Sequence, residues 1–239
     1  MNILTVDALR KEYPGFCLED VSFRVEEGTI MGFIGRNGAG KTTTLKAILG
    51  MVPITRGRIT FFGQETGVQE RAVRQRIGYA GGAVDYYKKK KIRRLLDITR
   101  RFYDGWDEAL CRKYLDLFSL DENKTPSQLS AGMKVKLNLA IALSHGAQLL
   151  ILDEPTSGLD PISREELLDI FRYLKGQGVT ILFSTHITSD LDRCADAITY
   201  IRAGRIVYTG SLGAFTGGQP LEEVMLRHEK EAFHEKFAD

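Results

Sequence analysis

The chain has 239 residues, of which 43% are hydrophobic and 27% are charged, and its formal net charge is +2. This composition is typical of a folded globular protein, so it excludes wholesale disorder, and the small net charge gives no sign of nucleic-acid binding. The three cysteines are scattered without metal-ligand spacing and no apolar run approaches the roughly 18 residues of a membrane span, so we expect reduced thiols in a cytosolic protein that would reach a membrane only through a partner.

The first 34 residues predict short β-strands. Apolar and polar residues alternate at 21–26, which is the period of a half-exposed strand. Tyr13 precedes this strand, and its ring could stack on a nucleobase or could simply lie at a strand edge. The apolar run at 29–34 predicts a buried strand, and residues 43–49 predict a helix.

Between these two elements, residues 35–42 fit the phosphate-binding pattern G-x-x-x-x-G-K-[ST]. Glycines allow the main chain to curl so that its N–H groups point at phosphate oxygens, next to the positive end of the following helix. Lys41 is expected to reach the β- and γ-phosphates, and the Thr42 hydroxyl to hold Mg²⁺. The sequence therefore predicts a nucleoside triphosphate site. The residues expected to bind the nucleotide here are Gly35, Asn37, Gly38, Ala39, Gly40, Lys41, Thr42 and Thr43.

The character of the chain changes after residue 82. A strand is predicted at 57–63, but residues 83–145 carry the apolar spacing of three helices. Within them, the basic stretch at 88–101 could be a solvated face, or it could contact an acidic partner or an anionic lipid surface. The apolar positions of the first two helices are Ile92, Leu95, Leu96, Thr99, Phe102 and Tyr103, then Leu110, Tyr114, Leu117 and Phe118.

The alternation of strands and helices resumes at residue 146. Buried strands are predicted at 149–152 and 179–183, and they are separated by a helix at 162–175. A short helix at 187–195 and a hairpin at 197–209 follow. The last residues, 211–239, predict a loop and a charged helix, which we expect to form a frayed tail.

These elements predict an α/β fold. We expect a phosphate-loop nucleoside-triphosphatase core with a mixed sheet, built from residues 1–82 and 146–210, and an antiparallel β subdomain at its N-terminus. An α-helical subdomain at 83–145 is inserted into this core, and 211–239 form a short tail.

Two acids, Asp153 and Glu154, directly follow the apolar strand at 149–152. Because α/β folds collect ligands at the carboxyl ends of their strands, Asp153 could hold Mg²⁺ there, directly or through water. Glu154 could then orient or deprotonate the attacking water. Two acids in this position could also cap the next turn, but the phosphate loop upstream favours the catalytic interpretation.

A second anion site is suggested by Leu129–Met133, which leads a helix predicted to begin near Lys134. Ser130 and the N–H groups around Gly132 would lie at the N-terminus of this helix, where negative groups are favoured.

In this order, the motifs resemble those of the nucleotide-binding subunit of an ATP-binding cassette (ABC) transporter, and the likeness runs from Val6 to Gly210. It identifies residues 35–42 as the Walker A loop and 129–133 as the LSGGQ signature. Asp153 and Glu154 then end the Walker B strand.

The resemblance implies further roles. Asp160 belongs to the D-loop, His186 is the switch histidine that touches the γ-phosphate, and Tyr13 is the aromatic that stacks on adenine. It also implies a head-to-tail homodimer or heterodimer, in which ATP lies between the Walker A loop of one protomer and Ser130–Gly132 of the other.

Three positions depart from the family pattern. Gly82 stands where a glutamine usually contacts Mg²⁺ and senses the partner, and Asp85 or water could replace that contact. In the signature, Ala131 replaces a glycine, which is a small change if its φ is negative, and Met133 replaces a glutamine. We expect the loss of that polar side chain to weaken the ATP-bound dimer modestly.

The resemblance implies a peripheral ATPase with the cofactors ATP and Mg²⁺ at the cytoplasmic face of a membrane, where integral-membrane permease subunits are its partners. Residues 103–134 are similar to ATPases of small ABC-2-type exporters of drugs or antimicrobial peptides. The alternatives are a soluble ABC ATPase of translation or DNA repair, and a regulatory subunit that binds ATP without cleaving it. The sequence leaves the transported substrate and the direction of transport open.

Overall fold

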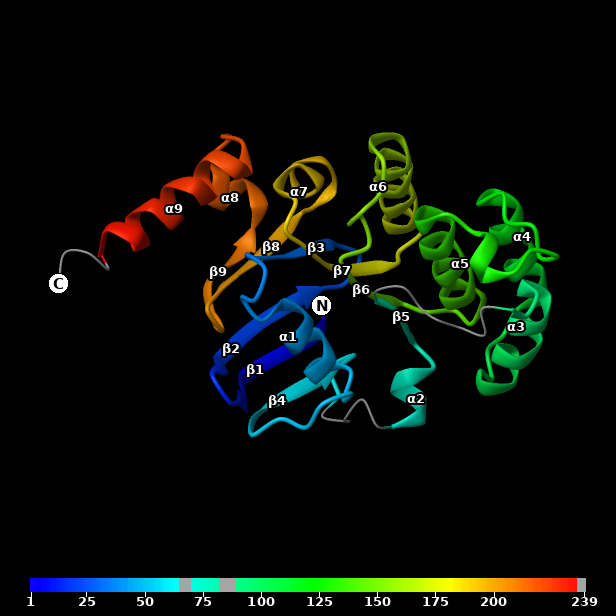
Figure 1. Ribbon diagram of the computed structural model, residues 1–239. Coiled ribbons are helices and arrows are strands. Elements are labelled where there is room, and N and C mark those ends of the chain that lie inside the picture. The colour runs from blue at the N-terminus through cyan, green and yellow to red at the C-terminus, as the bar shows by residue number, and fades with distance from the viewer. Residues whose placement is uncertain (65–69, 82–88, 236–239) are drawn as a thin grey trace.

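The computed structural model describes residues 1–64, 70–81 and 89–235, and side chains only as far as residue 230. Its strands form a three-stranded sheet in the order β2-β1-β4 and a six-stranded sheet in the order β5-β6-β7-β3-β8-β9 (Figure 1). The strands are β1 (Asn2–Tyr13), β2 (Phe16–Glu26), β3 (Ile30–Ile34), β4 (Arg56–Phe61), β5 (Ile77–Gly81), β6 (Leu149–Asp153), β7 (Thr180–Thr185), β8 (Ala197–Arg202) and β9 (Arg205–Ser211).

Helices surround the six-stranded sheet and extend from it at both ends (Figure 1). The α-helices are α1 (Lys41–Ile48), α2 (Arg71–Arg74), α3 (Ile92–Thr99), α4 (Glu108–Leu117), α5 (Ala131–Ser144), α6 (Pro161–Gly176), α7 (Thr188–Cys194), α8 (Leu212–Thr216) and α9 (Leu221–Glu235), and the 3-10 helices are η1 (Arg100–Phe102) and η2 (Pro126–Gln128). The predicted α/β class, with its mixed sheet, N-terminal antiparallel sheet and added helices, is confirmed.

The N-terminal sheet is antiparallel, and its strands are longer than the sequence predicted. β1 and β2 have 12 and 11 residues and form one hairpin, rather than several short strands. The predicted alternation holds in β2, where Val21, Phe23 and Val25 are buried and the residues between them are exposed. The sheet therefore turns one apolar face toward the core.

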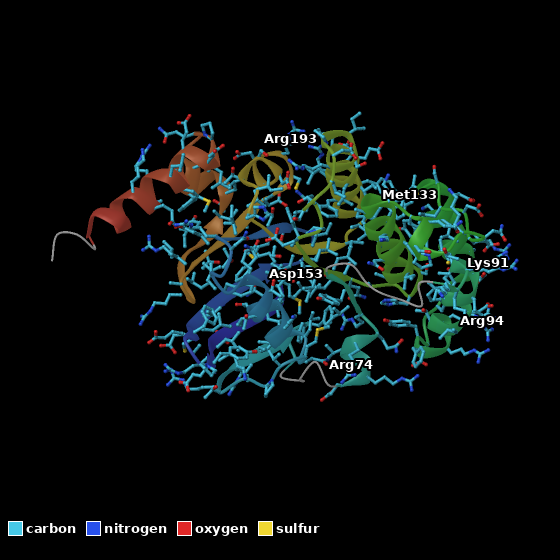
Figure 2. All side chains as sticks on the ribbon, in the orientation of Figure 1. Arg74, Lys91, Arg94, Met133, Asp153 and Arg193 are labelled. Carbon is cyan, nitrogen blue, oxygen red and sulfur yellow. The ribbon has the colours of Figure 1, made fainter. Side chains whose placement is uncertain are left out.

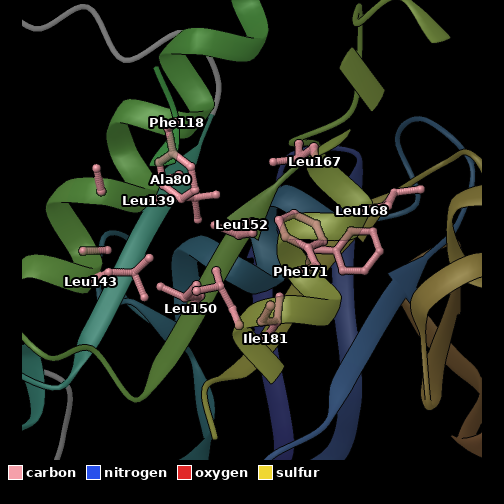
Figure 3. Packing of buried hydrophobic residues seen from close by; sticks show 14 of the residues in the cluster. Ala80, Phe118, Leu139, Leu143, Leu150, Leu152, Leu167, Leu168, Phe171 and Ile181 are labelled. Carbon is pink, nitrogen blue, oxygen red and sulfur yellow. The ribbon is translucent and has the colours of Figure 1, made fainter. Parts of the chain in front are cut away.

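The six-stranded sheet is parallel from β5 to β8, with β9 antiparallel at its edge. Its strands are apolar runs because both faces are covered. Leu150 and Leu152 of β6 pack with the helices, whereas Leu149 and Ile151 belong to a second cluster with α1 and the N-terminal sheet. Figure 3 shows the first of these clusters, with Leu150 and Leu152 close to Phe171 of α6.

The inserted helices α3, α4 and α5 gather at one end of the molecule, where we call them the helical arm (Figure 1). All three were predicted, and Ile92, Leu95 and Leu96 are buried as expected. Two of the predicted apolar contacts are wrong, because Phe102 is 67% exposed and Leu117 is 51% exposed. The chain turns out of the helix at η1, so Phe102 leaves the apolar face.

A polar junction fastens the arm to the core. The Gln75 side chain donates a hydrogen bond to Phe102 O (2.8 Å) and accepts one from the Asp104 N–H (2.9 Å). The His145 ring stacks on Tyr103 with centroids 3.8 Å apart, and its Nδ1 lies 3.1 Å from Gln75 O, to which it donates. Burial lowers the pKa of His145, because the charged imidazolium is poorly solvated there.

Acidification is expected to weaken the fold through His145. In the unfolded chain, His145 has the ordinary histidine pKa of about 6.5, whereas its pKa in the folded protein is lower. Between these two pKa values the unfolded chain therefore binds a proton that the folded protein does not. Stability is therefore lost as the pH falls from about 7 into this window. Urea unfolding at pH 7.5 and at pH 5.5 measures the loss. In His145→Phe, which retains an aromatic ring for stacking but cannot titrate, this part of the pH dependence should disappear; an equal slope in the variant would contradict the assignment.

The C-terminal helix is docked, and the expectation of a frayed tail is wrong for its described part. Leu221, Val224 and Met225 are buried, and the Leu221 N–H donates to the Asp192 carboxylate of α7 at 3.2 Å. Glu229 accepts from the Tyr200 hydroxyl and pairs with Arg36 at 3.7 Å. Charged composition suggested solvent on all sides, but one side of α9 lies on the core.

Truncating Leu221 to alanine is expected to lower the free energy of unfolding by about 2 to 5 kcal/mol, because its side chain is fully buried. Leu226→Ala on the same helix is the matched control, since Leu226 is 52% exposed, and should cost less than about 0.5 kcal/mol. Urea titrations of both variants measure the difference. Equal, small losses would mean that α9 is frayed after all.

Candidate active site

The phosphate-loop sequence lies between β3 and α1, as predicted. Gly40, which precedes α1, has a φ of 113°, a conformation that side chains rarely adopt. A Cβ added at Gly35 would lie 2.3 Å from Ile201 O, so the close packing of this loop on β8 also requires glycine. These two positions explain why glycines occur in this loop.

Lys41 is only 5% exposed, and its charge is compensated inside the protein. Its Nζ donates to Gly35 O at 2.7 Å and lies 3.1 Å from Glu154 Oε1. A buried ammonium is tolerated only with partners of this kind. The phosphate loop and the end of β6 are therefore joined by a charged pair.

Three oxygen-bearing side chains meet beside this pair. Asp153 Oδ1 accepts from the Thr42 hydroxyl (3.1 Å) and from the Ser184 hydroxyl (2.6 Å). Carboxylate and hydroxyl oxygens are the ligands that Mg²⁺ prefers, so this set fits the predicted ion. Sequence reasoning missed Ser184, although its position just before Thr185-His186 at the end of a buried strand could have drawn attention to it.

Glu154 is held in an unusual conformation. Its φ is 51°, and its N–H donates to both Ser184 Oγ (3.0 Å) and Ser184 O (3.2 Å). Its carboxylate Oε2 accepts a 2.8 Å hydrogen bond from His186 Nδ1. β6 and β7 are neighbouring parallel strands, so Glu154 and His186, far apart in the sequence, meet at one sheet edge.

Tyr13 lies at the end of the β1–β2 hairpin and is 41% exposed, with Lys11 Nζ 4.8 Å from its ring centroid. Phe16 is its partner across the hairpin. The Phe16 ring also approaches the phosphate loop, because a Cβ added at Gly40 would lie 2.9 Å from its Cζ. Sequence reasoning missed Phe16; its place across the turn from Tyr13 was the only available signal.

The other predicted site residues lie at helix starts. α5 begins at Ala131, so Ser130 is its N-cap and accepts from the Met133 N–H at 3.2 Å. Ala131 is helical and its φ is not positive, so its substitution for glycine is tolerated. Asp160 caps α6, and hydrogen bonds from the Ser163 side chain and from backbone N–H groups lower its pKa.

A cleft of about 340 Å³ separates the acids at the end of β6 from the start of α5. Asp153 and Glu154 line it on one side, and Ala131, Val135 and Asn138 of α5 line it on the other. Figure 2 shows Asp153 near the centre of the molecule and Met133 on the helical arm.

This single chain therefore brings Lys41, Glu154 and His186 into one contact series and Thr42 into contact with the adjacent Asp153, while the signature lies across the cleft. Gly82 and Asp85 lie outside the described residues.

Residues 18–157 match the family model described as ABC transporter. The chain belongs to the ABC transporter family. It is an ATP-binding subunit of that family, which hydrolyses ATP to power transport. Within the part of the chain that the structure describes, no helix is both long enough and apolar enough to span a bilayer.

Named relatives of this ABC subunit support the same assignment. It is 36% identical over 231 residues to the daunorubicin resistance ATP-binding protein DrrA3 of Streptomyces coeruleorubidus, covering 93% of this chain and 73% of that protein. It is 35% identical over 225 residues to the lantibiotic transport ATP-binding protein SrtF of Streptococcus pyogenes, covering 93% and 95%. A solved ATP-binding subunit of an ABC transporter superposes with a TM-score of 0.83 at 30% identity over 94% of this chain and 98% of that one.

Proposed function

We propose that this ABC subunit works as half of a head-to-tail dimer at the cytoplasmic face of a membrane, and that it drives export of a drug or antimicrobial peptide through separate permease subunits. The main support for ATP hydrolysis by this chain is the series of contacts from Lys41 through Glu154 to His186. A carboxylate that contacts both a phosphate-binding cation and a histidine is suited to the hydrolysis of a phosphoanhydride.

Within this site, Thr42 and Asp153 would hold Mg²⁺, which supplies charge neutralisation on the phosphates when bound. Lys41 binds the β- and γ-phosphates, and the N–H groups of the loop surround their oxygens. Glu154 orients the attacking water and accepts its proton, and His186 holds Glu154 and the γ-phosphate in place. Tyr13, beside Phe16, stacks on the adenine.

The position of the signature supports the proposed dimer. Ser130 and Gly132 lie at the start of α5, across the cleft from Asp153 and Glu154, where they could bind a nucleotide held by a partner chain. A Cβ added at Gly132 would meet nothing closer than 3.5 Å, so packing within this chain does not demand glycine there. Two-fold pairing would place this turn, with Asp160, over the phosphate loop of the partner. The pair can be a homodimer or a heterodimer.

Export is supported by the names of the relatives, which belong to daunorubicin resistance and lantibiotic transport. The relatives named above are transporter subunits, which disfavours a role in translation or DNA repair, and the intact Glu154–His186 contact disfavours a subunit that only senses ATP. The basic stretch at 88–101 is the expected docking region for the permease. Figure 2 shows Lys91 and Arg94 of this stretch on the outer side of the helical arm.

The first experiment is purification of the chain with ATP and Mg²⁺ from gently solubilised cells of its source, followed by identification of its companions. A polytopic membrane protein is expected. Exchanging Arg93 and Arg94, both exposed, for glutamates should abolish that association, while Glu222→Lys and Glu223→Lys, exposed charges at the other end of the molecule, should not. Ribosomes, nucleic acid or a soluble complex in place of a membrane protein would refute the transport role.

A further inference from the structure

A buried polar cluster lies behind the catalytic contacts. Asp190 of α7 is 1% exposed, and Thr156, in the turn after β6, is fully buried. Among the described residues, the buried atoms Asp190 Oδ2, Thr156 Oγ1 and Arg164 Nε have no hydrogen-bond partner. Unpaired buried polar atoms cost about 1 to 3 kcal/mol each, so stability alone does not explain them.

The members of this cluster act on one another electrostatically. Burial raises the pKa of Asp190, while the Thr156 hydroxyl and the charges of Arg164 and His186 act to lower it, and Glu154 acts to raise it. The Asp190 carboxyl therefore lies near the Thr156 hydroxyl and within electrostatic reach of both catalytic side chains, although Thr156 Oγ1 makes no hydrogen bond in this structure.

The positions of Thr156 and Asp190 in the chain make this buried pair informative. Thr156 closely follows Glu154, and Asp190, in the first turn of α7, closely follows His186. A bond between Thr156 and Asp190 would hold together the two segments that carry the catalytic acid and the switch histidine. Glu154 needs such support, because its φ of 51° is a strained conformation that persists only when surrounding contacts hold it.

We propose that Asp190 is a positioning residue for ATP hydrolysis, which binds the Thr156 hydroxyl and so keeps Glu154 and His186 in register when the ATP-loaded site closes. Arg164 of α6 balances its charge. The inference rests on the proposed roles of Glu154 and His186, and it adds a residue that touches neither the nucleotide nor the water.

The test is steady-state ATP hydrolysis by the full chain carrying Asp190→Asn or Thr156→Val. We expect kcat to fall about 10-fold in each, with KM for ATP unchanged, because positioning acts on the chemical step. The double variant should be no slower than either single variant, since both remove the same contact. Thr156→Ser keeps the hydroxyl and should restore the rate.

Asp192→Asn is the matched control. Asp192 lies on the same helix but is exposed and binds the start of α9, so its loss should leave kcat unchanged. Assays are run well below the lowest melting temperature of the set, and Thr156→Val probes the same contact if Asp190→Asn fails to fold.

The inference would be overturned by an unchanged kcat in Asp190→Asn, by additive losses in the double variant, or by an equal loss in Asp192→Asn. None of these results would refute the proposed function, which Glu154→Gln tests separately. Absence of phosphate release from the unmodified chain would overturn both.

Discussion

Replacing Glu154 with glutamine is expected to lower the rate of ATP hydrolysis by at least about 100-fold, because a general base typically contributes 10²- to 10⁴-fold. Glutamine keeps the size of the side chain but cannot accept the proton of the attacking water. The affinity for ATP should change little, since Lys41 retains the Gly35 carbonyl as a partner at 2.7 Å. Phosphate release and binding of a fluorescent ATP analogue measure the two quantities separately.

Glu165→Gln is the control for this variant. Glu165 lies on α6, where it pairs with Arg172 at 3.4 Å, and its side chain is 41% exposed. Its replacement should leave hydrolysis unchanged, because exposed ion pairs contribute little. If Glu154→Gln kept more than a tenth of the unmodified rate of ATP hydrolysis, a group other than Glu154 would have to be the general base.

Replacing Lys41 with alanine is expected to abolish hydrolysis and to weaken ATP binding by about 10- to 100-fold, since a hydrogen bond to a charged group contributes about 1.5 to 3 kcal/mol. The side chain is buried beside Glu154, so its removal also leaves that carboxylate without its cation. Calorimetric titration with ATP and a phosphate-release assay give both effects.

Lys46→Ala is the matched control, because Lys46 lies on the same helix but is exposed. Its replacement should change neither quantity. Slow hydrolysis by the unmodified chain, clearly above the Lys41→Ala background, is the expected baseline. If the two rates were equal, the isolated chain would not be a hydrolase under these conditions, and the catalytic roles proposed for Glu154 and His186 would fall.

The sequence by itself determined the features that depend on short spacing. The phosphate loop at 35–42, the two acids at the end of β6 and the cap Ser130 are local patterns, whose residue types are required by the main chain or the ligand next to them. Buried strands such as β3 and β6 were predictable for the same reason, since a strand covered on both faces must be apolar throughout. The family assignment followed from the order of these patterns.

The tertiary structure decided what depends on long-range contact. Ser184 reaches Asp153 only because β6 and β7 are neighbours, and Phe16 reaches Gly40 only because the β1–β2 hairpin folds over the loop. The docking of α9 could not be read from its charges, because a few apolar residues on one side suffice once the core offers them a surface. The periodicity of apolar residues indicates which face of an element is apolar, but it does not indicate which other element covers that face. The covering element is determined by how the whole chain packs.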